Sequence, residues 1–178
     1  DAPAGLVQAV KAQGSIVLGY VNVGAIETGR PWTSAAQAYK LDYWEQWDEW
    51  YADVSQAGFR RLVTDTIVPP MLAKGFDGLF LDNVDMVDTH PAQRAAMVQL
   101  VSQLSATVRA RGGYLFAQNG DDATVDAIAP HLDGWNREDV SYTYDDGYTA
   151  TDARDRQSAL STVRRLRARG LLVTTIDY

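Results

Sequence analysis

Short runs of apolar residues alternate with longer amphipathic stretches along this chain. The run at residues 15–23 is rich in β-branched side chains and is bounded by Gly14 and Gly24, which is typical of a buried strand. By the same criteria, six segments are predicted to be strands: 15–23, 51–54, 78–82, 113–119, 132–138 and 171–177.

The intervals between several of these strands show helical periodicity. In residues 91–111 apolar side chains recur every three or four positions, and a proline at the start suits a first helical turn. Residues 151–169 show a second helical pattern. Residues 58–74 show a third, which Pro69 and Pro70 should kink or break. Buried strands that alternate with helices form a parallel sheet, so the chain is predicted to be an α/β protein.

The length of 178 residues suits one core and therefore one domain, residues 1–178. A closed barrel of eight strand–helix units usually needs about 200 or more residues. The remaining choices are an open sheet or a barrel without its end units. The strand at 171–177 has no helix after it, which favours a TIM (β/α)8-type barrel that is incomplete, with about six parallel strands.

Composition and charge narrow the choice of function. The chain has 16 Lys and Arg against 23 Asp and Glu, a formal charge of -7, which argues against binding of nucleic acid. It has no cysteine and two histidines, so thiol catalysis, zinc–thiolate sites and multi-histidine metal sites are excluded. Because no run of about 18 apolar residues occurs, no membrane span is predicted.

Functional side chains of parallel α/β folds gather at the carboxyl ends of the strands. Asp82 follows the apolar run 79–81, and Glu138 ends the predicted strand 132–138. Taken singly, Asp82 is equally typical of a helix cap, and Glu138 of a surface ion pair. Two carboxylates from different strands at one rim are what acid/base hydrolysis of a glycosidic bond requires. The pair is therefore the leading candidate for a catalytic centre.

Three tryptophans, Trp44, Trp47 and Trp50, recur at every third position. This spacing favours a packed helical face. A platform on which sugar rings stack is the alternative interpretation.

Several segments resemble, in order along the chain, the motifs of one glycosidase family. The most specific is residues 74–85, Lys-Gly-Phe-Asp-Gly-Leu-Phe-Leu-Asp-Asn-Val-Asp. Residues 19–24, 118–120 and 176–178 support it, as does the segment 138–142. From about residue 14 to residue 178, the chain resembles the endo-α-1,4-polygalactosaminidase-like glycosidases of glycoside hydrolase family 114, which are TIM barrels.

The resemblance implies hydrolysis inside a chain of α-1,4-linked galactosamine without a cofactor or metal. Carried over to this sequence, it makes Glu138 the acid that protonates the leaving oxygen, and Asp82 the nucleophile or the base that activates water. It favours a retaining mechanism. The family's first strand and last βα unit have no counterpart here, so we expect these residues to be part of a longer chain.

The predicted partner is a cationic amino-sugar polysaccharide. Acidic side chains at the rim should neutralise its amines, while aromatic and polar groups should contact the sugar rings. The candidates are Tyr20, Glu27, Arg30, Asp53, Asp85, Asn119, Trp135, Tyr142 and Asp177. An enzyme with such a substrate is expected to be secreted or periplasmic. No signal peptide is recognisable, but the start at Asp1 is compatible with a terminus from which an export signal has been trimmed.

Two alternatives stay open. One is a carbohydrate-binding barrel that has no catalytic activity. The other is an enzyme that depends on a divalent cation held by Asp82 and Asp85, because Asp82, Asp85 and Asp88 are spaced by three.

Overall fold

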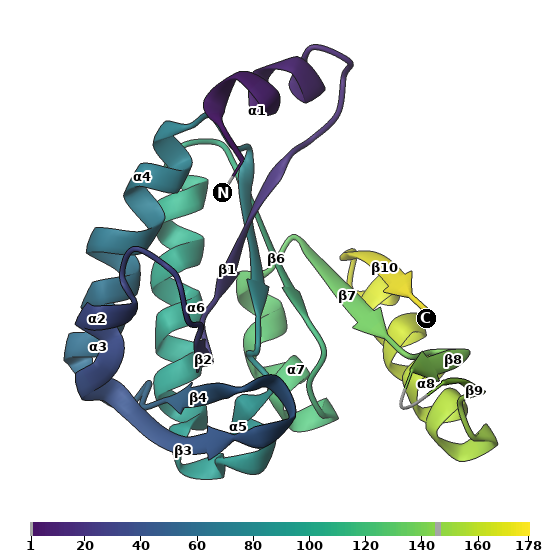
Figure 1. Cartoon of the computed structure of the whole chain (residues 1–178). Coiled ribbons are helices and arrows are strands. Elements are labelled where there is room, and N and C mark those ends of the chain that lie inside the picture. Colours follow the sequence, from purple (N-terminus) through teal and green to yellow (C-terminus); the bar gives the residue numbers. More distant parts are fainter. Residues whose placement is uncertain (1, 145–146) are drawn as a thin grey trace.

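The computed structural model describes residues 2–144 and 147–178, and its centre is a parallel five-stranded sheet (Figure 1). The strands are β1 (Leu18–Asn22), β5 (Gly78–Asp82), β6 (Tyr114–Gln118), β7 (Gly134–Glu138) and β10 (Leu172–Ile176). They lie in the order β1-β5-β6-β7-β10, and each pair of neighbours is parallel. Among the described residues β1 and β10 are not paired with each other, so the sheet is open, as expected for an incomplete TIM-like barrel.

Helices connect and cover these strands. The α-helices are α1 (Ala4–Lys11), α2 (Thr33–Ala36), α3 (Ala57–Arg61), α4 (Val68–Ala73), α5 (Met86–Thr89), α6 (Arg94–Arg109), α7 (Asp122–Ile128) and α8 (Ala153–Ala168). Short 3-10 helices are η1 (Gln37–Tyr39), η2 (Glu45–Trp47), η4 (Pro91–Gln93) and η5 (Ala129–His131). Helix α4 packs on β1, α6 on β6, and α8 on β7 and β10. No helix in the described ranges is long and apolar enough to cross a lipid bilayer.

The core lies between the sheet and these helices. Leu79, Leu81 and Leu115 of the central strands are fully buried, in one cluster with Leu100 and Leu104 of α6. Burial of each leucine contributes about 2 kcal/mol to folding. This core fixes the central strands, and with them the positions of the residues that follow their carboxyl ends.

The prediction of a sixth parallel strand at residues 51–54 is wrong. The segment lies at the end of β4 (Glu49–Ala52), which pairs antiparallel with β2 (Ala25–Ile26) and β3 (Lys40–Trp44). A tight turn through η2 and Asp48, whose φ is 53°, joins β3 to β4. Parallel neighbours need a crossover of a dozen or more residues, which this turn does not provide.

The predicted break in the helix at residues 58–74 falls earlier than the prolines. Residues 62–67 form a π-helix, η3 (Leu62–Ile67), between α3 and α4. Pro69 and Pro70 lie in the first turn of α4, directly after this π-helix, and have no backbone N–H to donate into it. Figure 1 shows the small β2-β4-β3 sheet beyond the carboxyl end of β1, whereas α1 lies at the opposite end of that strand.

Candidate active site

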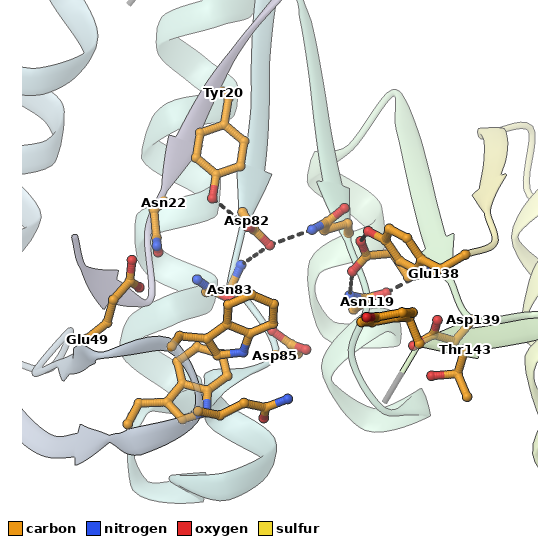
Figure 2. Close-up of a pocket in the computed structure, with 16 residues that line it drawn as sticks. Tyr20, Asn22, Glu49, Asp82, Asn83, Asp85, Asn119, Glu138, Asp139 and Thr143 are labelled. Carbon is orange, nitrogen blue, oxygen red and sulfur yellow. Dashed lines mark hydrogen bonds between the residues drawn. The ribbon is translucent and has the colours of Figure 1, made fainter. Parts of the chain in front are cut away.

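The carboxyl ends of the sheet strands open into a cavity of about 720 Å³ (Figure 2). Its walls are formed by residues at the ends of β1, β5, β6 and β7, by the β3–β4 segment, and by β8 (Tyr142–Tyr144), which pairs with β9 (Tyr148–Ala150). Most of the groups that face it are carboxylates, amides, phenols and indoles. The cavity therefore lies where a parallel α/β sheet places its chemistry.

Asp82, the last residue of β5, is held on both carboxylate oxygens. Its Oδ1 accepts hydrogen bonds from Gln118 Nε2 at 2.6 Å and from the backbone N–H of Asn83 at 2.7 Å. Its Oδ2 accepts from the Tyr20 hydroxyl at 2.6 Å (Figure 2). Burial, and then the hydrogen bond to Asp82, raise the pKa of Tyr20, so the phenol stays protonated and remains a donor. Three donors thus hold this carboxylate in one orientation.

Glu138, the last residue of β7, is held in a similar way. Its Oε2 accepts from Asn119 Nδ2 at 2.6 Å, and its Oε1 accepts from the Tyr178 hydroxyl at 2.5 Å. The backbone N–H of Glu138 donates to Asn119 Oδ1 at 3.1 Å. The hydrogen bond to Glu138 is the main reason that the pKa of Tyr178 rises to about 12. Each candidate catalytic carboxyl thus has one amide and one phenol as partners.

Strand β6 lies between the two carboxylates and orients both. Gln118, its last residue, donates to Asp82, and the next residue, Asn119, donates to Glu138. Because adjacent strands are about 4.8 Å apart, the β5 and β7 backbones are separated by about 10 Å. Asp82 and Glu138 both line the cavity, so the two carboxylates reach it from either side of β6.

The residue directly after each of these three strands has a left-handed backbone conformation. The φ angles are 57° for Asn83, 59° for Asn119 and 57° for Asp139. Asn and Asp adopt this region more readily than other residues that carry a side chain. At the neighbouring β1 end, a Cβ atom on Gly24 would lie 1.9 Å from the backbone oxygen of Asn83. The absence of a side chain there lets the two strand ends pack against each other.

Burial and, after it, neighbouring carboxylates raise the pKa of several carboxyl groups in the cavity wall. Burial, and then the charge of Asp82, raise the pKa of Asp85 to about 6. Burial raises the pKa of Glu49 on β4, with further contributions from Glu27 and Asp82. Burial is also the main reason for a raised pKa at Asp139, with the charge of Glu138 adding to it. Such a cluster of acids favours binding of a cation.

The structure brings five of the residues proposed from the sequence together in the cavity wall, namely Tyr20, Asp82, Asp85, Asn119 and Glu138. Glu27 and Arg30 form an ion pair of 2.7 Å with each other outside that wall. Asp53 accepts hydrogen bonds from side chains near the start of α3 and from Gln93, also away from the cavity. The expectation that these three border the cavity is therefore not met.

Three further candidates lie behind or beside the cavity. Trp135 is fully buried, and its indole N–H donates to the backbone oxygen of Asn119 at 3.0 Å. Asp177 accepts from the backbone N–H groups of Ser141 and Tyr142, which holds the loop before β8. Tyr142 is exposed and does not line the cavity. Buried or outward-facing side chains such as these do not contact a ligand in the cavity directly.

The β3–β4 segment contributes Trp44 and Trp47, which the sequence offered only as an alternative sugar-stacking platform, and Glu49, which was missed. Trp44 ends β3 and Trp47 lies in η2, so the prediction of a helical tryptophan face is wrong. Both line the cavity together with Glu49, whereas Trp50 packs against Tyr43. The sequence signal that could have found them is the clustering of aromatic and acidic residues at 43–50.

The three aspartates spaced by three diverge in the structure. Asp85 precedes α5 and lines the cavity, but Asp88 accepts from Asp121 N at 2.7 Å and Thr124 Oγ1 at 2.6 Å, next to α7. Within residues 2–144 and 147–178, no group of three or more His, Asp or Glu side chains is placed to hold a metal ion.

The sequence profile of glycoside-hydrolase family GH114 matches residues 1–178, which is the whole chain. The chain belongs to this family. A protein of Deinococcus radiodurans is 29% identical over 191 residues, which cover 99% of this chain and 60% of that protein. The GH114 chain thus spans 60% of the length of this relative.

Two solved structures have the same fold as this GH114 chain. The glycoside hydrolase domain of PelA from Pseudomonas aeruginosa has a TM-score of 0.82 at 22% identity, over 99% of this chain and 73% of that domain. Ega3 of Aspergillus fumigatus, solved in complex with galactosamine, has a TM-score of 0.76 at 20% identity, over 99% of this chain and 66% of Ega3. The family and the barrel-type fold expected from the sequence are confirmed.

Proposed function

We propose that this chain is a glycosidase that cleaves α-1,4-galactosaminidic bonds inside an amino-sugar exopolysaccharide. One observation carries the proposal: Asp82 and Glu138 reach one cavity from two strands, and each is held by an amide side chain of the strand end between them. Glycoside hydrolysis uses such a pair of carboxyl groups on either side of the scissile bond. Membership of GH114 supports the same reaction class.

The two carboxyl groups have different proposed roles. Glu138 in its protonated form gives its proton to the glycosidic oxygen as the bond from that oxygen to the anomeric carbon breaks. Asp82, ionised and held by donors on both oxygens, attacks the anomeric carbon or takes a proton from the attacking water. We favour the first course, which retains the anomeric configuration. NMR spectroscopy of the first-formed product distinguishes the two.

The cavity wall supports a cationic sugar as the substrate. Glu49 and Asp85 have raised pKa values because they are buried near other carboxylates, and a substrate ammonium would relieve that repulsion. The rings of Trp44 and Trp47 are in the same wall, and aromatic faces of this kind pack on sugar rings. The chain of Ega3, which was solved with galactosamine, has the same fold.

The proposal is tested with a partly deacetylated α-1,4-galactosamine polymer. The unaltered chain should shorten it, and the length distribution of the products reports whether cleavage is internal. Asp82→Asn and Glu138→Gln should each lower kcat by about a thousandfold while polymer binding persists. Asp65→Asn, which removes a carboxylate on an exposed helical surface, is the control and should leave kcat unchanged. If either active-site variant keeps near-normal kcat, that residue is structural and the assignment of the pair is wrong.

Two outcomes would redirect the proposal. Binding of the polymer without any cleavage by the unaltered chain would favour a carbohydrate-binding barrel. Loss of cleavage on addition of EDTA, with recovery on addition of a divalent cation, would favour a metal-dependent reaction.

An extracellular polysaccharide as substrate also leads us to propose a secreted or periplasmic location, which fractionation of the producing cells would test.

A further inference from the structure

A row of polar side chains crosses the five-stranded sheet at the level of Asp82. It contains one residue from each strand: Asn22, Asp82, Gln118, Asn136 and Thr174. Two residues earlier along the strands, the corresponding row is Tyr20, Phe80, Phe116, Gly134 and Leu172. That earlier row is apolar apart from the hydroxyl of Tyr20, so the unbroken row of polar side chains lies at the level of Asp82.

The middle of this row is buried. Asn136 is 1% exposed and Gln118 is 8% exposed. An amide in such a position is unfavourable unless its polar atoms are hydrogen-bonded, and an apolar side chain would be the usual occupant. The hydrogen bonds of Gln118 and Asn136 must therefore offset the cost of burying the two amides.

All hydrogen bonds along the row run in one direction. Thr174 Oγ1 donates to Asn136 Oδ1 at 2.7 Å, and Asn136 Nδ2 donates to Gln118 Oε1 at 3.2 Å. Gln118 Nε2 in turn donates to Asp82 Oδ1 at 2.6 Å. The chain of donors begins on β10, passes through β7 and β6, and ends on the carboxylate of β5.

The carboxylate sets this direction. An ionised carboxylate only accepts, so Gln118 must turn its NH₂ group toward Asp82 and its carbonyl toward Asn136. Asn136 must then donate with its own NH₂ group, and its carbonyl is left for Thr174, whose hydroxyl can donate. Each bond in such a chain polarises the next, so the final donor to Asp82 is strengthened.

We propose that Asn136 is a positioning residue that fixes the side-chain amide of Gln118 in the orientation that donates to Asp82. Asn136 is too deeply buried to contact substrate, so its effect passes through Gln118. Thr174 acts through Asn136, because its hydroxyl donates to Asn136 Oδ1. The expected effect on kcat rests on the proposed function of Asp82, whereas the orientation of Gln118 does not depend on that function.

Other charged and titratable groups also face Asp82 and must be held constant in a test. They are Tyr20 on β1, Glu49 on β4, Asp85 before α5, Glu138 on β7 and Tyr178 after β10. None of them is changed by a substitution at position 136 or 174. A change in the titration of Asp82 in those variants therefore reports on the row.

The test compares Asn136→Leu and Thr174→Val with the unaltered chain. Leu has the shape of Asn without its donor and acceptor, and Val has the shape of Thr without its hydroxyl. Carbon-13 NMR follows the side-chain carboxyl of Asp82 as a function of pH, and kcat and KM on the galactosamine polymer are measured over the same range. Thr175→Val is the matched control, because Thr175 is paired with Arg137 and lies one residue out of the row.

Both variants should make Asp82 titrate at higher pH, Asn136→Leu more than Thr174→Val, because the ionised form loses support from the donor of Gln118. The acidic limb of the kcat profile should move in the same direction, with kcat reduced about threefold or more and KM little changed. Thr174→Ser, which keeps the hydroxyl, and Thr175→Val should both show the Asp82 titration and the kcat profile of the unaltered chain.

An unchanged titration of Asp82 in folded Asn136→Leu would overturn the proposal, as would an equal effect of Thr175→Val. If Asn136→Leu does not fold, the comparison of Thr174→Val with Thr174→Ser tests the proposal instead, because only the second variant keeps the hydroxyl that donates to Asn136. If the unaltered chain does not cleave the polymer, the proposed function fails, but the NMR titration still decides whether the row orients Gln118.

Discussion

Asn119 holds Glu138 at two points, since its Nδ2 donates to Glu138 Oε2 at 2.6 Å and its Oδ1 accepts from the Glu138 backbone N–H at 3.1 Å. One side chain thereby fixes both the backbone and the carboxyl group of the candidate acid. The geometry is possible because Asn119 has a φ of 59°, which turns its side chain toward β7 just beyond the end of β6.

Removing the Asn119 side chain should impair turnover more than stability. We expect Asn119→Gly to lower kcat by about tenfold to a hundredfold, because Glu138 loses a donor, while the left-handed backbone is retained. Asn119→Ala should show the same loss of kcat and be less stable than the glycine variant by about 1 kcal/mol, because alanine is strained at this φ. Initial rates and urea unfolding measure the two effects, and equal stability of the two variants would contradict the backbone argument.

Asp85 should make the fold less stable as the pH rises toward neutrality. Its pKa is raised to about 6 in the folded chain, above the value of about 4 for an exposed Asp. The folded state therefore holds this proton more tightly, and its contribution falls by up to about 3 kcal/mol between about pH 4 and pH 6. Asp85→Asn should remove that slope and be the more stable form at pH 7.

Urea unfolding of both forms at several pH values measures the effect of Asp85. Asp155→Asn provides a control at an exposed carboxylate of α8. If Asp85→Asn and the unaltered chain lose stability in parallel over this range, burial does not keep Asp85 protonated.

A side chain at position 24 should disturb the rim. The Cβ of Gly24→Ala would lie 1.9 Å from the backbone oxygen of Asn83, so the strand ends must move apart at a cost of about 1–3 kcal/mol. Because Asn83 N donates to Asp82, kcat should fall as well. Gly5→Ala, where a Cβ meets nothing within 4 Å, is the control and should be neutral or slightly stabilising. Chemical denaturation of both variants provides the comparison.

Trp47 should contribute to substrate binding without taking part in bond cleavage. It is 61% exposed and lines the cavity next to Trp44, with the two ring centroids 6.2 Å apart. We expect Trp47→Ala to raise KM for the polymer about tenfold, corresponding to the loss of one stacked ring at about 1.4 kcal/mol, with kcat little changed. Trp47→Phe should recover most of the affinity, and a fall in kcat at unchanged KM would assign the ring another role.

The central strands could be predicted from the sequence because their side chains are buried on one face by helices and must be apolar. Leu79 and Leu81 show this pattern, and they place Asp82 at the rim without further information. The sheet of β2, β3 and β4 could not be predicted in the same way, because its strands are short and mix aromatic with charged residues. The spacing of Trp44 and Trp47 does not mark a longer helix, because Trp44 ends β3 and only the single 3-10 turn of η2 follows it.

The members of the candidate site that were predicted are those fixed by position along a strand. Asp82 and Glu138 are of this kind. Those that were missed depend on contacts between segments distant in the chain, such as Glu49, which reaches the cavity from the antiparallel sheet. Alternation along the last strand could have favoured Tyr178 over Asp177, because Tyr178 is two residues beyond Ile176, the register partner of Glu138.

The left-handed residues Asn83, Asn119 and Asp139 restrict which mutations the rim can accept. Each follows a strand and has a φ between 57° and 59°, so β-branched residues are excluded at all three positions by backbone geometry alone. A saturation library selected only for folding should therefore retain Asn, Asp and Gly there. The same library selected for turnover should lose Gly at position 119, where the side chain also holds Glu138. Positions where the two selections accept the same residues are needed for the backbone of the rim. Positions where they differ carry a side chain that is needed for turnover.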